Sequence, residues 1–230
     1  MITKTIIIPC FNEFKTIKLL IERVKKNISL EDNIIIVDDG SNDGTKEYLE
    51  SISDENIDVK FHNINQGKGQ AIQTALSGNL NEIIIIQDAD LEYNPNDYKL
   101  LLKPFEETNA DVVYGSRFIG TNDYVRVHLF WHYLANKILT FICNIFTNLN
   151  MSDMETGYKS FKKKAIQSIK LNEKSFGVEP EITIKLAKKK FKFYEVPISY
   201  AGRSYDEGKK IGIKDAVRAI YCIFRYSFKS

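Results

Sequence analysis

The 230-residue chain has few cysteines and no features of a secreted or metal-thiolate protein. Cys10, Cys143 and Cys222 are scattered, odd in number and without the spacing of metal ligands, which fits reduced thiols in a cytosol. An apolar strand-like segment begins almost at the amino terminus, so we expect no signal peptide.

The sequence also lacks an uninterrupted apolar run and a large net charge. Its most apolar long segment, residues 127–149, contains His128, His132, Asn136 and Lys137, which argues against a membrane-spanning helix. The net charge is only +2, so no overall field favours a nucleic acid partner. Apolar residues make up 43% and charged residues 27%, as in ordinary soluble proteins, and we expect one domain over residues 1–230.

What the chain does have is a series of short apolar runs, each followed by polar residues. Thr5–Ile8, Ile34–Val37 and Ile83–Ile86 read as buried strands separated by helix-length segments, and Val59–His62 and Asp111–Tyr114 as further strands. We expect a Rossmann-like α/β sheet with helices on both faces. Such sheets bind ligands at the carboxyl edge of their strands. Helices are expected at Thr16–Ile28, Asp43–Ser51, Asn65–Leu80 and Asn96–Glu107.

Two carboxylates follow the central strand. Asp88 and Asp90 are two residues apart, so in extended geometry both side chains would leave on the same side. Carboxylates held that close repel each other unless a cation lies between them, and oxygen ligands suit Mg²⁺ or Mn²⁺ bound to a substrate's phosphates. An ordinary acidic turn is the alternative for an isolated Asp-x-Asp.

Other polar groups extend this picture of a nucleotide-diphosphate site. Asn65–Gly69 places two glycines and Lys68 at a helix start, where free N–H groups favour anions, although a plain glycine turn would look the same. Asp39 could accept a hydrogen bond from a nucleobase. Arg117, Arg126 and Arg203 lie in separate loops and could form bidentate pairs with phosphate.

Taken together, the motifs resemble glycosyltransferase family 2, and within it the dolichyl- or polyprenyl-phosphate sugar synthases of the dolichol-phosphate mannose synthase type. The resemblance covers nearly the whole chain, and no single motif carries it. The motifs are Pro9–Glu13, Val37–Thr45, Asn65–Gly69, Asp88–Leu91, Gly115–Phe118, Asp153–Lys159, Phe176–Glu181 and Arg203–Lys210.

The resemblance implies a GT-A fold, a nucleotide-sugar donor, a divalent metal and inversion at the sugar's anomeric carbon. It also implies a donor-binding half, residues 1–120, and an acceptor-binding half, residues 121–230. Nucleoside contacts would come from Pro9, Phe11, Glu13, Val37 and Asp39. The metal and diphosphate would be held by Asp88, Ala89 and Asp90, and phosphates by Arg117, Arg126 and Arg203. The residues placed in catalysis are Asp88, Asp90 and Arg117.

Two positions depart from the family pattern. Phe11 replaces the usual tyrosine, which keeps stacking but loses a hydroxyl, and Glu92 replaces a glutamine, which leaves the sugar and the metal's third ligand open. A lipid phosphate is already an anionic nucleophile near neutral pH, so the reaction requires charge neutralisation and no general base. Asp153 could still serve as a base or organise the acceptor.

The carboxy-terminal part contains apolar residues at helical spacing. One such stripe runs from Phe130 to Phe146, and a second occupies Lys214–Phe228, flanked by Lys214, Arg218, Arg225 and Lys229. Basic amphipathic helices of this kind lie in membrane interfaces, although packing on the domain or on another subunit is the commoner explanation. We expect a peripheral protein on the cytoplasmic face of a membrane, with a homo-oligomer or a membrane-protein partner left open.

Three other functions compete with a polyprenyl-phosphate hexosyltransferase. A glycan or protein acceptor is disfavoured by the loop arginines and the aromatic helices. A nucleotidyltransferase is disfavoured because no glycine-rich loop follows the first strand. A catalytically silent membrane-associated subunit is disfavoured by the intact Asp88 and Asp90.

Overall fold

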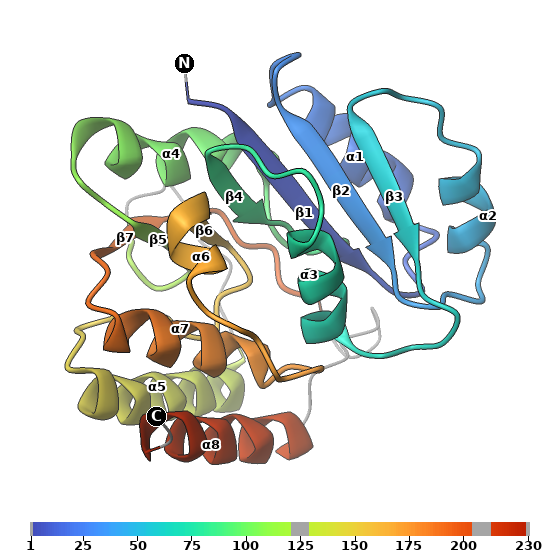
Figure 1. The fold of residues 1–230 in the computed structure, drawn as a ribbon. Helices are drawn as coiled ribbons and strands as arrows, with labels where there is room; N and C mark the ends of the chain where they lie inside the picture. The colour runs from blue at the N-terminus through green and yellow to red at the C-terminus, as the bar shows by residue number, and fades with distance from the viewer. Residues whose placement is uncertain (1, 121–128, 204–212, 229–230) are drawn as a thin grey trace.

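The computed structural model describes residues 2–120, 129–203 and 213–228. Within these ranges the chain forms one seven-stranded sheet covered by helices (Figure 1). The strands are β1 Lys4–Cys10, β2 Asn33–Asp38, β3 Ile57–Phe61, β4 Ile83–Ile86, β5 Val112–Ser116, β6 Lys159–Lys162 and β7 Phe193–Pro197. The helices are α1 Ile17–Lys25, α2 Thr45–Glu50, α3 Lys68–Leu76, α4 Tyr98–Glu107 after a 3-10 turn at Pro95–Asp97, α5 Phe130–Thr147, α6 Lys163–Gln167, α7 Val178–Lys188 and α8 Ile213–Phe228.

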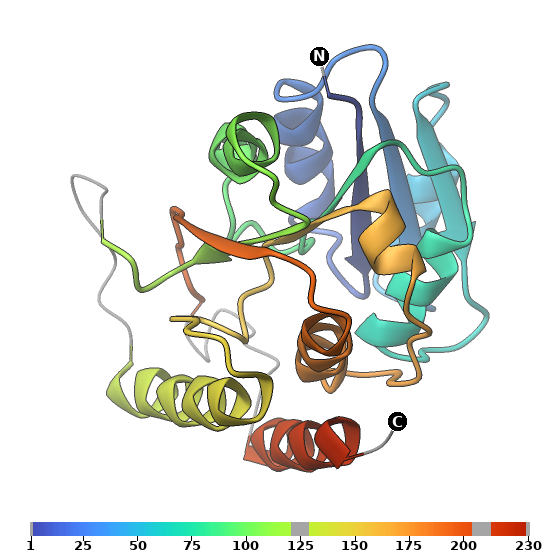
Figure 2. The same cartoon turned by 60° about the vertical axis from the view of Figure 1, so that its left-hand side comes forward.

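Both faces of the sheet are apolar at its centre because β1, β2 and β4 contain runs of three or four isoleucines. Ile6 and Ile8 pack with α1 and α4 on one face, and Ile7 packs with α3 and α7 on the other, as expected from the alternation of side chains along a strand. Helices α5 and α8 lie side by side beyond α7, and both views show them forming an outer layer (Figures 1 and 2).

The strand order is β3-β2-β1-β4-β6-β5-β7, and only β6 runs antiparallel to its neighbours. The carboxyl ends of β1, β2, β4, β5 and β7 therefore lie at one edge of the sheet. Because β6 runs the other way, its first residue, Lys159, pairs with the last residue of β4, Ile86. The loop before β6 thus reaches the same edge, and this topology gathers polar residues from distant parts of the sequence.

The expected strands and helices of the first 120 residues are present, with ends that differ by a few residues. The strand β6, the helices α6 and α7 and the strand β7 were not predicted. The sheet therefore extends into the half of the chain that we expected to bind the acceptor.

Candidate functional site

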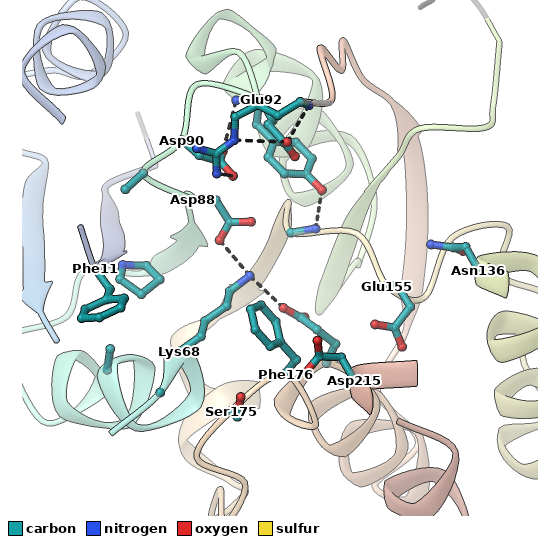
Figure 3. A pocket seen from close by; sticks show the side chains of 18 of the residues that line it. Phe11, Lys68, Asp88, Asp90, Glu92, Asn136, Glu155, Ser175, Phe176 and Asp215 are labelled. Carbon is teal, nitrogen blue, oxygen red and sulfur yellow. Dashed lines mark hydrogen bonds and ion pairs between the residues drawn. The ribbon is translucent and has the colours of Figure 1, made fainter. Parts of the chain in front are cut away.

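A pocket of about 750 Å³ opens at the edge where these strands end (Figure 3). Its walls come from the loops after β1, β2, β4, β5 and β7, from the loop before β6, and from α3, α5, α7 and α8. Ten of the predicted site residues line it, namely Pro9, Phe11, Glu13, Asp39, Lys68, Asp88, Ala89, Asp90, Arg117 and Arg203.

Two predicted residues are not in this set. The side chain of Val37 is fully buried in the core beside α3, so the structure does not place it in the pocket. Its position in β2, one residue before Asp38, makes it part of the sheet. Arg126 lies outside the described residues.

A chain of alternating charges begins at Asp88. The Lys68 ammonium lies 2.7 Å from Asp88 Oδ1 and 3.0 Å from Glu179 Oε1, and Glu179 Oε2 lies 2.6 Å from the Lys159 ammonium. Burial alone would lower the pKa of Lys68, but the Asp88 and Glu179 carboxylates raise it above its ordinary value. Lys68 is therefore a permanent cation at the start of α3, beside Asp88.

A second cluster surrounds Asp90. The Arg203 guanidinium donates to Asp90 Oδ2 at 2.9 Å and lies 3.3 Å from Glu13 Oε1. Glu92 accepts hydrogen bonds from the Arg203 backbone N–H at 2.7 Å and from the Tyr200 hydroxyl at 2.7 Å. Glu92, the departure from the family pattern, thus anchors the segment that carries Arg203 over the pocket.

The backbone conformation around Asp88 and Asp90 differs from the one predicted. The strand ends at Ile86, and residues 89–90 form a turn, followed by Leu91 with φ 63°. The prediction that an extended backbone places the Asp88 and Asp90 side chains on the same side was therefore wrong. Both side chains nevertheless line the pocket. Each of them is paired with its own cation, Asp88 with Lys68 and Asp90 with Arg203.

The charges around Asp90 fit a divalent cation. Burial and the charges on Asp88 and Glu92 raise the pKa of Asp90 to about 7, against the lowering effect of Arg203. Such mutual repulsion is what an added cation relieves, and carboxylate oxygens are ligands suited to Mg²⁺ or Mn²⁺. No three acidic, histidine or cysteine side chains among the described residues already converge as a metal site.

Asp39 organises the glycine loop at the start of α3. Its carboxylate accepts hydrogen bonds from the backbone N–H groups of Gln66 at 2.9 Å and Gly67 at 2.7 Å, and lies 2.6 Å from His62 Nδ1. Gly67 has φ +99°, a left-handed conformation that glycine adopts without strain. The predicted nucleobase contact of Asp39 stays a prediction, and the structure adds this second role.

Arg117 is held by an acid rather than pointing freely into the pocket. Its Nε and one terminal nitrogen donate to the two oxygens of the buried Asp153, both at 2.7 Å. Burial would raise the pKa of Asp153, but Arg117 holds it below its ordinary value. An ionised carboxylate with both oxygens in a bidentate pair is poorly placed to act as a base.

Sequence reasoning missed several pocket residues. The Tyr93 hydroxyl oxygen accepts a hydrogen bond from the Gly157 N–H at 2.7 Å in the pocket wall, and Asn136 comes from α5. Glu155 and Glu179 also line the pocket. The only available signal for these two was their position inside the Asp153–Lys159 and Phe176–Glu181 motifs, because neither has a pattern of its own.

The seven-stranded mixed sheet with its polar carboxyl edge is an α/β GT-A fold. A crystal structure of glucosyl-3-phosphoglycerate synthase from Mycobacterium tuberculosis with Mn²⁺, UDP and phosphoglyceric acid superposes with a TM-score of 0.76, covering 99% of this chain and 79% of that one at 17% identity. A complex of the same enzyme with Mg²⁺ and UDP gives a TM-score of 0.73 at 16% identity, covering 98% and 79% of the two chains.

The family follows from the sequence comparisons. The glycosyl transferase family 2 profile matches residues 5–170, and the chain belongs to that family. An uncharacterised protein of Methanocaldococcus jannaschii is 32% identical over 95% of this chain and 98% of its own length. An undecaprenyl-phosphate mannosyltransferase of Micrococcus luteus is 25% identical over 90% and 86%. The Haloferax volcanii glycosyltransferase AglJ is 28% identical over 86% and 63%.

Replacing Glu155 by glutamine should stabilise the protein at high pH. Burial and the Glu179 carboxylate raise the pKa of Glu155 to about 7, against the lowering effects of Lys159 and Arg117. An unfolded chain releases this proton near pH 4.3, so the contribution of Glu155 to stability is lost as the pH rises from about 4.3 through about 7. The free energy of unfolding of Glu155→Gln, relative to wild type, should grow by on the order of 2 to 3 kcal/mol between about pH 5 and about pH 8.

Urea unfolding at the two pH values measures this difference, with Glu47→Gln on the exposed face of α2 as the control. A difference that is the same at both pH values would contradict the raised pKa of Glu155.

Proposed function

We propose that this glycosyltransferase transfers a hexose from a nucleotide-diphosphate sugar to a polyprenyl phosphate, dolichyl or undecaprenyl, with inversion at the anomeric carbon. The observation that carries the proposal is a single pocket with an acidic edge at Asp88 and Asp90 and a wall made by two helices with exposed apolar faces, α5 and α8. The similarity to the Micrococcus luteus undecaprenyl-phosphate mannosyltransferase supports the choice of acceptor.

The donor would lie along the edge of the amino-terminal half, residues 1–120. Phe11 offers a ring for stacking on the base, and Pro9, Glu13 and Asp39 flank it. Lys68 and the N–H groups at the start of α3 would face the diphosphate. A divalent cation held by Asp88 and Asp90 would neutralise the charge that develops on the departing diphosphate, and crystals of structural neighbours contain Mn²⁺ or Mg²⁺ with UDP.

The acceptor phosphate is anionic before it reacts, so the protein must bind and orient it without removing a proton. This agrees with an Asp153 that is committed to Arg117. Arg203 lies among the carboxylates of Glu13, Asp90 and Glu92, and a cation at Asp90 would free its guanidinium for phosphate. The phosphate contact of Arg126 stays a prediction from the sequence, as does the division into donor and acceptor halves.

The outer faces of α5 and α8 support a peripheral membrane protein. We call these residues the apolar face: on α5 they include Trp131, 75% exposed, and Phe141, 65% exposed. On α8 they include Val217, 62% exposed, Phe224, 44%, and Phe228, 75%. Ala219, Cys222 and Ile223, by contrast, pack inward. No helix in the described part of the chain is long and apolar enough to span a membrane.

The charges around α8 differ from the prediction. Arg218 lies 2.5 Å and Arg225 3.7 Å from the carboxylate of Glu173, so both are paired within the protein. The side chain of Lys214 and all of Lys229 lie outside what the structure describes. We therefore expect membrane attachment to depend more on apolar insertion than on anionic lipid.

Transfer should be detected as radiolabelled hexose that moves from a nucleotide sugar into an organic-soluble polyprenyl phosphate. UDP-glucose and GDP-mannose are tested as donors with Mn²⁺. Asp90→Asn should reduce the transfer rate at least about 100-fold, because the site loses a cation ligand. Asp58→Asn, on the exposed side of β3, is the matched control and should retain full activity. Label that enters 3-phosphoglycerate or a glycan but no lipid would overturn the proposed acceptor.

The apolar face should bind vesicles. Replacing Trp131, Phe141 and Phe224 together by serine should abolish co-sedimentation with phosphatidylcholine and phosphatidylglycerol vesicles, because each exposed apolar side chain loses favourable insertion. The control replaces Leu30 and Ile64, which are 89% and 70% exposed on another part of the molecule. Equal pelleting of both variants would mean that α5 and α8 do not contact lipid.

A further inference from the structure

The proposed reaction gives no role to two pocket carboxylates, Glu155 and Asp215. Glu155 lines the pocket from the loop before β6, and its Oε1 is buried with no hydrogen-bond partner among the described residues. Leaving a buried polar atom unpaired costs free energy, so such an atom calls for an explanation in the function of the site. Asp153, two residues earlier, is fully paired with Arg117, which makes the contrast local.

Glu155 lies beyond the diphosphate end of the pocket. Figure 3 shows it on the other side of Lys68 from Phe11, together with Asn136 of α5. Gly157, two residues after Glu155, approaches Asp88 so closely that a side chain at Gly157 would collide with the Asp88 carboxylate. The loop that carries Glu155 therefore rests directly on the candidate metal and diphosphate position.

The chemistry at this end suits hydroxyl groups better than phosphate. The cations that line the pocket, Lys68, Arg117 and Arg203, are each paired with carboxylates in the described structure. Lys159, whose charge acts on Glu155, is bound to Glu179. The polar groups that line the pocket beyond Lys68 include the carboxylates of Glu155 and Asp215 and the amide of Asn136. Carboxylates accept hydrogen bonds from the hydroxyl groups of a neutral sugar ring, and an amide both donates and accepts them.

We propose that Glu155 is a specificity-determining residue, whose carboxylate accepts hydrogen bonds from hydroxyl groups of the sugar carried by the donor. This inference rests on the proposed function, because it requires a nucleotide sugar with its diphosphate at Asp88 and Lys68. The sugar follows the diphosphate in such a donor, so it must occupy the space where Glu155 lies. A carboxylate has two oxygens and can bind two neighbouring hydroxyls, and a site built to bind a hydroxyl strongly rejects a sugar that lacks it.

The raised pKa of Glu155 agrees with this assignment. A buried carboxylate without a hydrogen-bond partner destabilises the folded protein at high pH, where it is ionised. Hydrogen bonds from sugar hydroxyl groups would favour the ionised form of Glu155. If Glu155 had a purely structural role, its contacts would stabilise the protein and replacing it would cost stability. The variant Glu155→Gln is instead expected to be more stable than wild type at high pH, because it lacks the buried charge. Weakened sugar binding in a variant that is more stable than wild type cannot be attributed to unfolding.

The test compares binding of nucleotide sugars with binding of the nucleotides alone. Calorimetry in Mn²⁺, without acceptor, measures the affinity of wild type, Glu155→Gln, Glu155→Ala and the control Glu47→Gln for UDP-glucose, GDP-mannose, UDP and GDP. We expect the preferred nucleotide sugar to bind Glu155→Ala at least about 10-fold more weakly than it binds wild type, because a hydrogen bond to a charged group contributes about a factor of 10 in affinity. The matching nucleoside diphosphate, which has no sugar at this position, should bind Glu155→Ala within about 2-fold of its affinity for wild type.

Deoxy analogues of the preferred donor, each lacking one hydroxyl, identify the contact. At least one deoxy donor should bind wild type more weakly than the parent nucleotide sugar does. The same deoxy donor should bind Glu155→Ala with the same affinity as the parent, which is the result expected when the missing hydroxyl contacts Glu155 directly. Equal weakening of nucleotide and nucleotide-sugar binding, or deoxy penalties that persist unchanged in Glu155→Ala, would overturn the role of Glu155 alone. Failure of wild type to bind any nucleotide sugar would overturn both this role and the proposed function.

Discussion

The structure depends on holding buried and partly buried carboxylates at one edge of the sheet. Glu13 follows β1, Asp88, Asp90 and Glu92 follow β4, and Glu179 comes from the start of α7, while Lys68, Arg203 and Lys159 hold these carboxylates by ion pairs. Buried ion pairs offset a desolvation cost rather than adding much net stability. The cluster is therefore better explained by a ligand that brings its own charges, such as a cation with a diphosphate, than by folding.

The sequence predicted the parts of this edge that local patterns encode. Short runs of β-branched apolar residues favour buried strands, and Gly-Lys-Gly favours a helix start, so Asp39, Lys68 and Asp88 were expected at this edge, and all three line the pocket. The pairing of Arg117 with Asp153 and of Glu92 with Arg203 could not be predicted, because each joins residues far apart in the chain. The strand β6 was missed because Lys159–Lys162 is too short and polar to show a period, although its antiparallel course brings Glu155 to the pocket.

The two ends of the pocket differ in how they are built. The end proposed for the donor is formed largely by strand termini fixed by the sheet, whereas the far wall is formed by α5 and α8, whose outer faces are apolar and whose inner faces pack on α7. Glu173 connects the two, because it binds Arg218 and Tyr226 of α8 while its backbone carbonyl accepts a hydrogen bond from Gln73 of α3. The loop that contains Glu173 therefore links α8 to α3, the helix that begins at Lys68.

The central claim is that the carboxylates at this edge form a site for a cation and a nucleoside diphosphate. Equilibrium dialysis of radiolabelled UDP and GDP against the wild-type protein, in Mn²⁺ and in EDTA, tests it without any assumption about the acceptor. One of the two nucleotides should bind at least about 10-fold more tightly in Mn²⁺, because the cation neutralises charge on both the diphosphate and Asp90. Equal affinity in Mn²⁺ and EDTA, or no binding of either nucleotide, would contradict it.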